Sequence, residues 1–201
     1  MKTFLKYGFL FSVLFLIINA VQPQKNLDFL LDTNKSKVYW FCDHHKGIIK
    51  FVDGKIVYKY GVPYQANFTI DMTTMVDTDI DNKLIKGTLE NTLKSDVFFD
   101  VKNYPKAYFN SDEITPINDT LYHIKGDFVL FDTGICHDFN GTFKIKKDSL
   151  YFNVKDIVLD RTDWSIFYGS RNNPNPSEEE EGIVVSDTIK IGVDIVLALK
   201  K

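Results

Sequence analysis

The last long stretch of the chain alternates apolar side chains with polar or small ones, with a period of two. In "TIKIGVDIVLAL", residues 188–199, aliphatic side chains occupy every second position. Successive side chains of a β-strand point to opposite faces of a sheet, so this stretch is typical of a long strand with one buried face. Shorter runs alternate in the same way: "KVYWFC", "QANFTIDM", "LYHIKGDFVL", "GTFKIK" and "SLYFNVKDIV".

Turn-forming residues separate these runs. They predict short connections at Asp53-Gly54, at Pro116 to Asp119, at Asn140-Gly141 and in "KKDS" before Leu150. Many strands joined by short turns, with little helical pattern, predict an antiparallel sandwich or a closed barrel.

Two stretches depart from the strand pattern. In "LKSDVFFDVKNYP" we expect one short helix, because Ser95 can cap its N-terminus, Phe98 and Phe99 supply an apolar side and Pro105 limits its continuation. Residues 171–182, with two prolines and four consecutive glutamates, predict a loop, because this composition does not suit a packed strand.

The first 20 residues have the layout of a secretory signal peptide. Lys2 and Lys6 precede an apolar run that ends near Ala20, and the run is shorter than the roughly 20 residues that a membrane span needs. An uncleaved anchor is the alternative. We therefore expect a signal peptide at 1–20, one domain at 21–201, and a periplasmic or secreted protein. A composition of 44% hydrophobic and 25% charged residues with a net charge of -3 is typical of a globular domain and argues against a nucleic-acid partner.

The two cysteines leave alternatives open. An oxidising compartment would permit a disulfide between Cys42 and Cys136. Histidines follow both, in "CDHH" and "CH", so a zinc or copper site with sulfur and nitrogen ligands is a second alternative. The spacing fits no standard structural zinc pattern, and free cysteine commonly behaves as a small apolar residue. The expectation is therefore unbridged structural cysteines, with no bound metal or cofactor.

A calcium loop and a catalytic site are also disfavoured. Asp77, Asp79 and Asp81 have the spacing that begins an EF-hand loop, but Thr88 stands where the bidentate glutamate is needed and Asn82 where the glycine is needed. A solvated acidic turn is predicted instead. The chain has no nucleophile elbow and no zincin motif, and no catalytic residue is predicted.

The only two arginines, Arg161 and Arg171, lie in or directly after "DRTDWSIFYGS". A guanidinium donates up to five hydrogen bonds in a fixed plane, so arginine in a lysine-rich chain indicates a position where geometry matters. Asp160 precedes Arg161, which favours a structural clasp of these two residues together with Trp164. Arg171 has no acidic neighbour and precedes the loop, where it is expected to meet an anionic head group or one of the glutamates at 178–181.

Several motifs resemble those of the YceI-like family. "LENTLKSDVFFDVKNYPKAYF" resembles its helix signature, "DRTDWSIFYGS" its late motif, and "KVYWFCDHHKGIIKF" its first strands, with His45 before a glycine; "FTIDMTTM" fits the next strand. The resemblance extends from about Leu31 to the C-terminus. It implies an all-β protein, a lipocalin-like eight-stranded antiparallel β-barrel with a short helix. It also implies an exported carrier that holds a long isoprenoid chain inside the barrel.

The expected ligand-binding residues are the aromatic and polar residues of these motifs: His45, Trp40, Phe98, Phe99, Trp164, Tyr168, Ser170 and Arg171. Expected partners are a long-chain isoprenoid or other apolar lipid, with only transient membrane contact, and a homodimer is compatible with the sequence. Two alternatives stay open. One is a secreted metal-dependent or redox protein that uses the cysteines and histidines. The other is a barrel filled by its own aromatic side chains, with a structural or interaction role.

Overall fold

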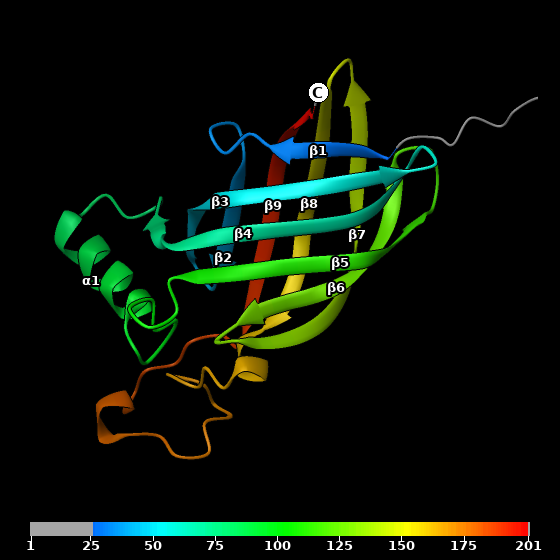
Figure 1. Ribbon diagram of the computed structural model, residues 1–201. Coiled ribbons are helices and arrows are strands. Elements are labelled where there is room, and N and C mark those ends of the chain that lie inside the picture. The colour runs from blue at the N-terminus through cyan, green and yellow to red at the C-terminus, as the bar shows by residue number, and fades with distance from the viewer. Residues whose placement is uncertain (1–25, 201) are drawn as a thin grey trace, which may run out of the picture.

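The computed structural model describes residues 26–200, and the predicted signal peptide lies outside them. The strands, in chain order, are β1 (Leu27–Leu31), β2 (Lys37–Cys42), β3 (His45–Lys59), β4 (Val62–Asp77), β5 (Lys106–Pro116), β6 (Leu121–Leu130), β7 (Thr133–Lys146), β8 (Ser149–Asp160) and β9 (Thr188–Leu199). The helices are α1 (Lys83–Lys94) and two 3-10 helices, η1 (Arg161–Trp164) and η2 (Glu178–Glu180). Figure 1 shows them. In the part of the chain that is described, no helix has the length and apolar character to cross a bilayer.

The strands close into a barrel with eight positions. The order β3-β2-β9-β8-β7-β6-β5-β4 is closed by pairing of β3 with β4, and every pair is antiparallel. The short strands β1 and β2 share one position between β3 and β9. On β3, Val38 of β2 pairs with Ile49, whereas Phe29 of β1 pairs further along with Ile56. The all-β, eight-stranded antiparallel barrel with one short helix is confirmed.

The helix lies earlier in the chain than predicted. Ser95 ends α1 rather than beginning a helix, and the side chain of Asn82 caps the start by accepting hydrogen bonds from the amides of Leu84 and Ile85 at 3.0 and 3.3 Å. After Ser95 the chain forms tight turns, and Asp100 adopts a left-handed backbone conformation with φ of 40°. The apolar residues of the family signature are thus held by turns that directly follow the helix.

Two of the predicted turns are wrong. Asp53-Gly54 lies inside β3 and Asn140-Gly141 inside β7. A Cβ atom on Gly54 would lie 2.3 Å from the ring of Phe68, and one on Gly141 would lie 2.5 Å from the ring of Phe152. Each glycine therefore lets an inward-pointing aromatic ring lie against the strand backbone. The other two predicted turns connect β5 to β6 and β7 to β8.

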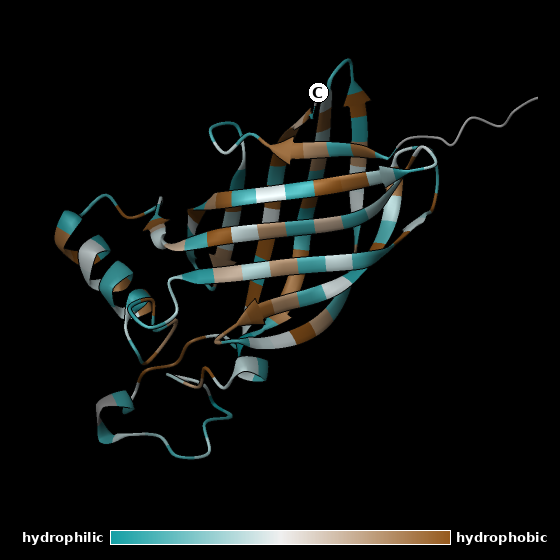
Figure 2. Cartoon of the chain, in the orientation of Figure 1, coloured by the Kyte–Doolittle hydropathy of each residue, from teal (hydrophilic) through white to brown (hydrophobic). Residues whose placement is uncertain are grey.

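One end of the barrel is filled by side chains. We call this the packed end; there β3 meets β4, β5 meets β6 and β7 meets β8 through connections of two to four residues. Its interior residues are exposed by at most 2%: Phe29, Ile56, Ala66, Ile124, Leu150 and Leu197. The rings of Phe143 and Phe152 stack there with centroids 4.4 Å apart. Along the strands, hydrophobic and hydrophilic residues alternate (Figure 2), as expected for a barrel with one face inside.

The other end, the open end, carries the two long connections. Residues 78–105 include α1, and residues 161–187 include η1 and η2. In Figure 1, α1 and the 161–187 segment both lie at this end of the barrel.

Candidate functional site

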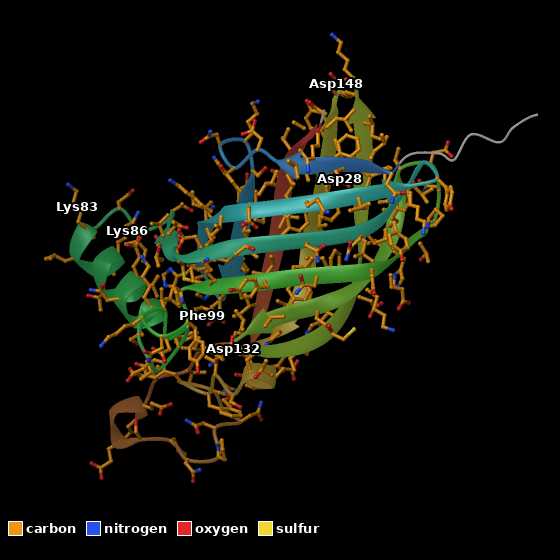
Figure 3. All side chains as sticks on the ribbon, in the orientation of Figure 1. Asp28, Lys83, Lys86, Phe99, Asp132 and Asp148 are labelled. Atoms are coloured by element: carbon orange, nitrogen blue, oxygen red, sulfur yellow. The ribbon has the colours of Figure 1, made fainter. Side chains whose placement is uncertain are left out.

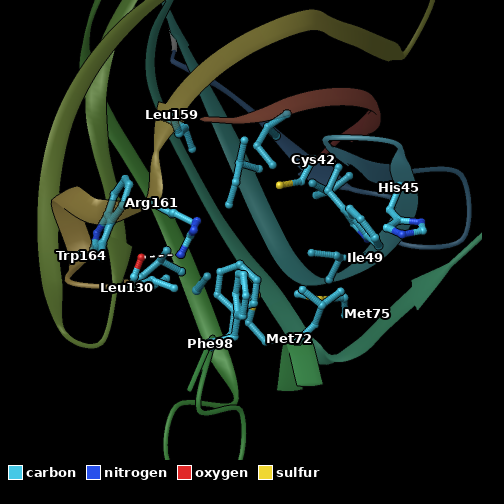
Figure 4. Close-up of a pocket in the computed structure, with 18 of the residues that line it drawn as sticks. Cys42, His45, Ile49, Met72, Met75, Phe98, Leu130, Leu159, Arg161 and Trp164 are labelled. Carbon is cyan, nitrogen blue, oxygen red and sulfur yellow. Dashed lines mark hydrogen bonds between the residues drawn. The ribbon is translucent and has the colours of Figure 1, made fainter. Parts of the chain in front are cut away.

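The open half of the barrel contains a cavity of about 1160 Å³. Its wall is mainly aliphatic and aromatic, and it is built from strands of the whole ring, from α1 and from residues 161–189. The apolar wall residues on the strands include Ile49, Phe51, Ile70, Met72, Met75, Ala107, Phe109, Phe139, Ile157, Leu159, Ile189, Ile191 and Val193. Figure 4 shows part of this wall, with Met72, Met75 and Ile49 facing Leu159 across the space.

Aromatic rings separate the cavity from the packed end. Phe152 lines the cavity and also stacks on Phe143, which does not line it. Phe68 lies against Phe152, with ring centroids 6.3 Å apart, and Phe109 against Phe139, at 5.6 Å. These rings form the floor of the cavity.

The helix supplies part of the wall with one face. Ile85, Thr88, Leu89 and Thr92 line the cavity, and their spacing of three and four residues places them on the same side of α1. Figure 3 shows Lys83 and Lys86 on the outer side of the helix and Phe99 at its junction with the barrel. Two of these four residues are threonines, so the face lacks the continuous apolar periodicity by which a helix is recognised in a sequence.

Polar side chains gather at the rim of the cavity. The β2–β3 turn contributes Cys42, Asp43, His44 and His45, and residues 161–187 contribute Arg161, Arg171, Asn172, Ser186 and Asp187. A long apolar interior with polar groups at one end suits an amphipathic molecule whose polar end stays near water.

Arg161 is buried, with 1% of its surface exposed, and connects η1 to the end of the 161–187 segment. Its guanidinium donates to the carbonyl oxygens of Ser186 at 2.8 Å, Ile166 at 2.7 Å and Val185 at 3.0 Å. Figure 4 draws one of these hydrogen bonds. The guanidinium carbon also lies 5.2 Å from the centre of the Phe98 ring. Arg161 thus fixes the segment that covers the open end.

The ion pair of Arg161 is with Asp187, whose Oδ1 lies 3.2 Å from Nη2, and not with the predicted Asp160. Asp160 instead caps η1, because its Oδ1 accepts hydrogen bonds from the amide and hydroxyl of Thr162 at 2.9 and 2.7 Å. Burial lowers the pKa of the Arg161 guanidinium, and the charge of Asp187 opposes this shift. The buried cation is held by a carboxylate and three carbonyl groups.

Most of the predicted ligand-binding residues lie in one place. Trp40, His45, Phe98, Phe99, Trp164, Tyr168 and Arg171 all line the cavity. Trp164 is buried, and its Nε1 donates to the carbonyl of Thr133 at 3.0 Å. Ser170 is not part of the wall; its hydroxyl accepts a hydrogen bond from the amide of Asn172.

Arg171 differs from Arg161 in its surroundings. It is exposed at the rim and, among the residues whose side chains are described, forms no ion pair within 4.0 Å. Glu180, one of its predicted partners, instead accepts hydrogen bonds from Gly169, Asn173 and Ser177.

Both cysteines are free. Cys42 is half-buried at the cavity rim, and its sulfur lies 3.8 Å from the carbonyl oxygen of Ser186. Burial raises the pKa of its thiol to about 11, with a smaller contribution from the charge of Asp43 and an opposing one from Arg161. Cys136 is exposed on β7.

The fold and the cavity define a class of protein, the closed antiparallel β-barrel with an apolar interior space. Within that class the chain belongs to the YceI-like family, because the model of the YceI-like domain matches residues 29–197. A search of curated proteins found no match.

Solved structures share the fold. BcnA from Burkholderia cenocepacia is 20% identical with a TM-score of 0.65, over 83% of this chain and 98% of that one. A polyisoprenoid-binding domain from Saccharophagus degradans, implicated in plant cell wall breakdown, is 14% identical with a TM-score of 0.60, over 87% and 99%. The YCEI protein of Campylobacter jejuni is 15% identical with a TM-score of 0.54, over 81% and 84%.

Proposed function

We propose that the barrel binds one long-chain isoprenoid or similar apolar lipid, with the chain in the cavity and the polar end at the rim. The observation that carries this proposal is the apolar cavity of about 1160 Å³ with polar groups at one end only. Pockets for drug-sized ligands have volumes of roughly 300–1000 Å³. The cavity is therefore large enough for a long, slender molecule.

Burial of a hydrocarbon chain provides the binding energy. Each CH₂ group removed from water contributes about 0.8 kcal/mol. An apolar cavity does not hold water well, because water there lacks hydrogen-bond partners. The likeness to a polyisoprenoid-binding domain from Saccharophagus degradans supports an isoprenoid as the ligand class.

The rim favours an anionic head group over a neutral one. Arg161 already has an ion-pair partner, whereas Arg171 is exposed at the rim. A guanidinium binds phosphate or carboxylate through paired hydrogen bonds. Arg171 is therefore the group that we assign to the head of the lipid.

The protein acts as an exported carrier, not as an enzyme, in this proposal. Residues 1–20 direct it to the periplasm or the exterior, and it contacts membranes transiently to load or release lipid. The raised pKa of Cys42 keeps its thiol protonated near neutral pH, which disfavours a nucleophilic or redox role. A homodimer is compatible with this function, and sedimentation of the purified protein measures it.

Mass spectrometry of an organic extract from natively purified protein tests the ligand. We expect one lipid with a long apolar chain per barrel. The matched variant is Ala107→Trp, which places a large side chain in the cavity wall, and it should retain several-fold less lipid. A folded wild-type protein that carries no lipid and captures none from extracted membranes would contradict the proposal.

A further inference from the structure

Three side chains converge at the open end, outside the apolar part of the cavity wall. They are His45, the first residue of β3, Asp77, the last residue of β4, and Asp79. One ligand atom from each lies within 4.8 Å of those of the other two. Pairing of β3 with β4 brings them together, since Gly47 lies opposite Asp77.

The backbone around these residues is well fixed. The amide of Lys46 donates to Oδ1 of Asp79 at 3.1 Å, and the amide of Thr78 donates to the carbonyl of Lys46 at 2.9 Å. The amide of Asp77 donates to Oε1 of Glu90 on α1 at 2.9 Å. The cluster thus connects the barrel to the helix.

Asp77 is fully buried, and only one of its carboxylate oxygens is satisfied. Oδ1 accepts hydrogen bonds from the amides of Asp79 and Ile80 at 3.1 and 2.8 Å, whereas Oδ2 has no partner. Among the described residues, no lysine or arginine forms an ion pair with Asp77. A buried carboxylate oxygen without a partner is costly, so this oxygen is available to accept a ligand.

A ring nitrogen of His45 is available in the same way. Its Nδ1 is buried without a hydrogen-bond partner and lies 3.6 Å from Oδ2 of Asp79. A cation between the three groups would satisfy the imidazole nitrogen and the free oxygen of Asp77 together.

We propose that His45, Asp77 and Asp79 bind a divalent transition-metal ion of the zinc class. One imidazole and two carboxylates suit such an ion, whereas calcium takes six to eight oxygen ligands. Bond lengths of about 2.0–2.2 Å place tetrahedral ligand atoms roughly 3.4 Å apart. The 3.6 Å between His45 and Asp79 is already close to this value, whereas the widest separation in the cluster, at most 4.8 Å, must close by up to about 1.4 Å. His45 and Asp79 are partly exposed and can move toward the anchored Asp77.

Three protein ligands leave a fourth position open to water or to a polar group of a molecule at the rim. His45 also lines the cavity, so the metal would lie beside the polar end of a bound lipid. The open position of the metal would thus offer a second polar contact at the rim, in addition to Arg171.

Zinc titration of protein made without a histidine tag and stripped with a chelator tests the site. With zinc sulfate as the only added ligand, calorimetry should show one ion per chain and a rise in melting temperature, and calcium chloride should produce neither. His45→Gln and Asp77→Asn should each weaken zinc binding by about ten-fold or more.

The control variants are His123→Gln and Asp81→Asn. His123 lies 3.6 Å from Asp138, the same separation as in the proposed site but outside any described cluster of three ligands, and Asp81 is exposed. Both controls should bind zinc like the wild type. Absence of saturable zinc binding to wild type, or equal binding by His45→Gln, would overturn the proposal, and His45→Gln keeps the test valid if Asp77→Asn fails to fold.

Discussion

The packed end and the open end of the barrel are built from the same strands but differ in what fills them. At the packed end, Ile56, Ile124, Leu150 and Leu197 have no exposed surface, and the connections are short. At the open end, side chains from the same strands surround a cavity of about 1160 Å³, covered by the connections at residues 78–105 and 161–187.

The difference indicates that the two halves of each strand have different roles, one in stability and the other in forming the cavity. Protein interiors are normally packed at crystal-like density, and an empty volume forfeits the contacts that its wall would otherwise make. We therefore expect the packed end to contribute more to the stability of the barrel than the open end does. The open end gives up stability, and a bound chain restores contacts there.

The largest expected difference in stability between the two ends comes from replacing a leucine by alanine at each end. Leu150→Ala opens a new cavity in the packed end and should lower the free energy of unfolding by about 3–5 kcal/mol. Leu159→Ala enlarges a space that already exists and should cost about 1–2 kcal/mol. Urea denaturation of delipidated protein measures both. Equal losses would mean that the open end is packed as tightly as the other.

Replacing a small side chain by a large one should have different effects on stability at the two ends, and at the open end it should also reduce lipid binding. Ala66 is buried in the packed end and Ala107 lines the cavity. Ala66→Trp should destabilise the protein by about 1–3 kcal/mol or more through overpacking. Ala107→Trp should change stability by less than about 1 kcal/mol while reducing lipid capture. A destabilised Ala107→Trp protein with full lipid content would contradict the comparison.

Substitutions of the two arginines at the open end should also have different effects on stability and on lipid capture. Arg161→Lys removes hydrogen bonds to buried carbonyl groups and should lower stability by about 1–3 kcal/mol. Arg171→Lys serves as the matched control, and its effect should stay within about 0.5 kcal/mol. Arg171→Ala should leave the melting temperature nearly unchanged and weaken capture of a prenyl phosphate more than of the neutral prenyl alcohol. The assignment fails if Arg161→Lys is silent and Arg171→Ala unfolds the protein.

Side-chain alternation predicted β2, β4, β6, β8, β9 and the second half of β7, because each of these strands has one face inside the barrel. It indicated none of β1, β3 and β5. The stretch at 188–199 is a strand in full, as is "KVYWFC". Turn chemistry was less reliable, because glycine serves two purposes. Gly54 and Gly141 make room for aromatic rings inside strands, and a sequence does not show which ring will lie over them.

The helix was predicted at the wrong residues because burial does not follow the helix itself. Phe98 and Val101 are buried, but they project from tight turns after α1, whereas most of the helix itself is only partly covered. Strong apolar periodicity is therefore absent from the true helix, and its capping residue, Asn82, was read as part of an acidic turn.

The contacts at the rim join residues that are far apart in the sequence, so the sequence did not predict them. Asp187 lies 26 residues from its partner Arg161, so local spacing favoured Asp160. His45 meets Asp77 and Asp79 only because β3 pairs with β4. Asp77 was predicted to be solvated, but it is fully buried, so that prediction is wrong.

The smallest expected effect is a difference in alkylation rate between the two thiols, one at the cavity rim and one on the outer surface. The pKa of Cys42 is raised by burial from 9.0 to about 11, so at pH 9 only about 1 in 100 of these thiols is ionised, compared with about half for an unperturbed thiol. A raised pKa favours the protonated form, so the alkylation rate of Cys42 should keep increasing up to about pH 11.

Cys136 is exposed and provides the internal control. With iodoacetamide and single-cysteine variants, Cys136 should react first, and Cys42 should react more slowly still when lipid occupies the open end. Replacement of either cysteine by alanine should cost no more than about 1–2 kcal/mol. A Cys42 that reacts as fast as Cys136, and equally fast with and without lipid, would show that the rim of the cavity is not closed by the ligand. Because Cys42 lies at the rim and not on the floor, this measurement reports on the polar end of the binding site separately from the apolar part that Ala107→Trp tests.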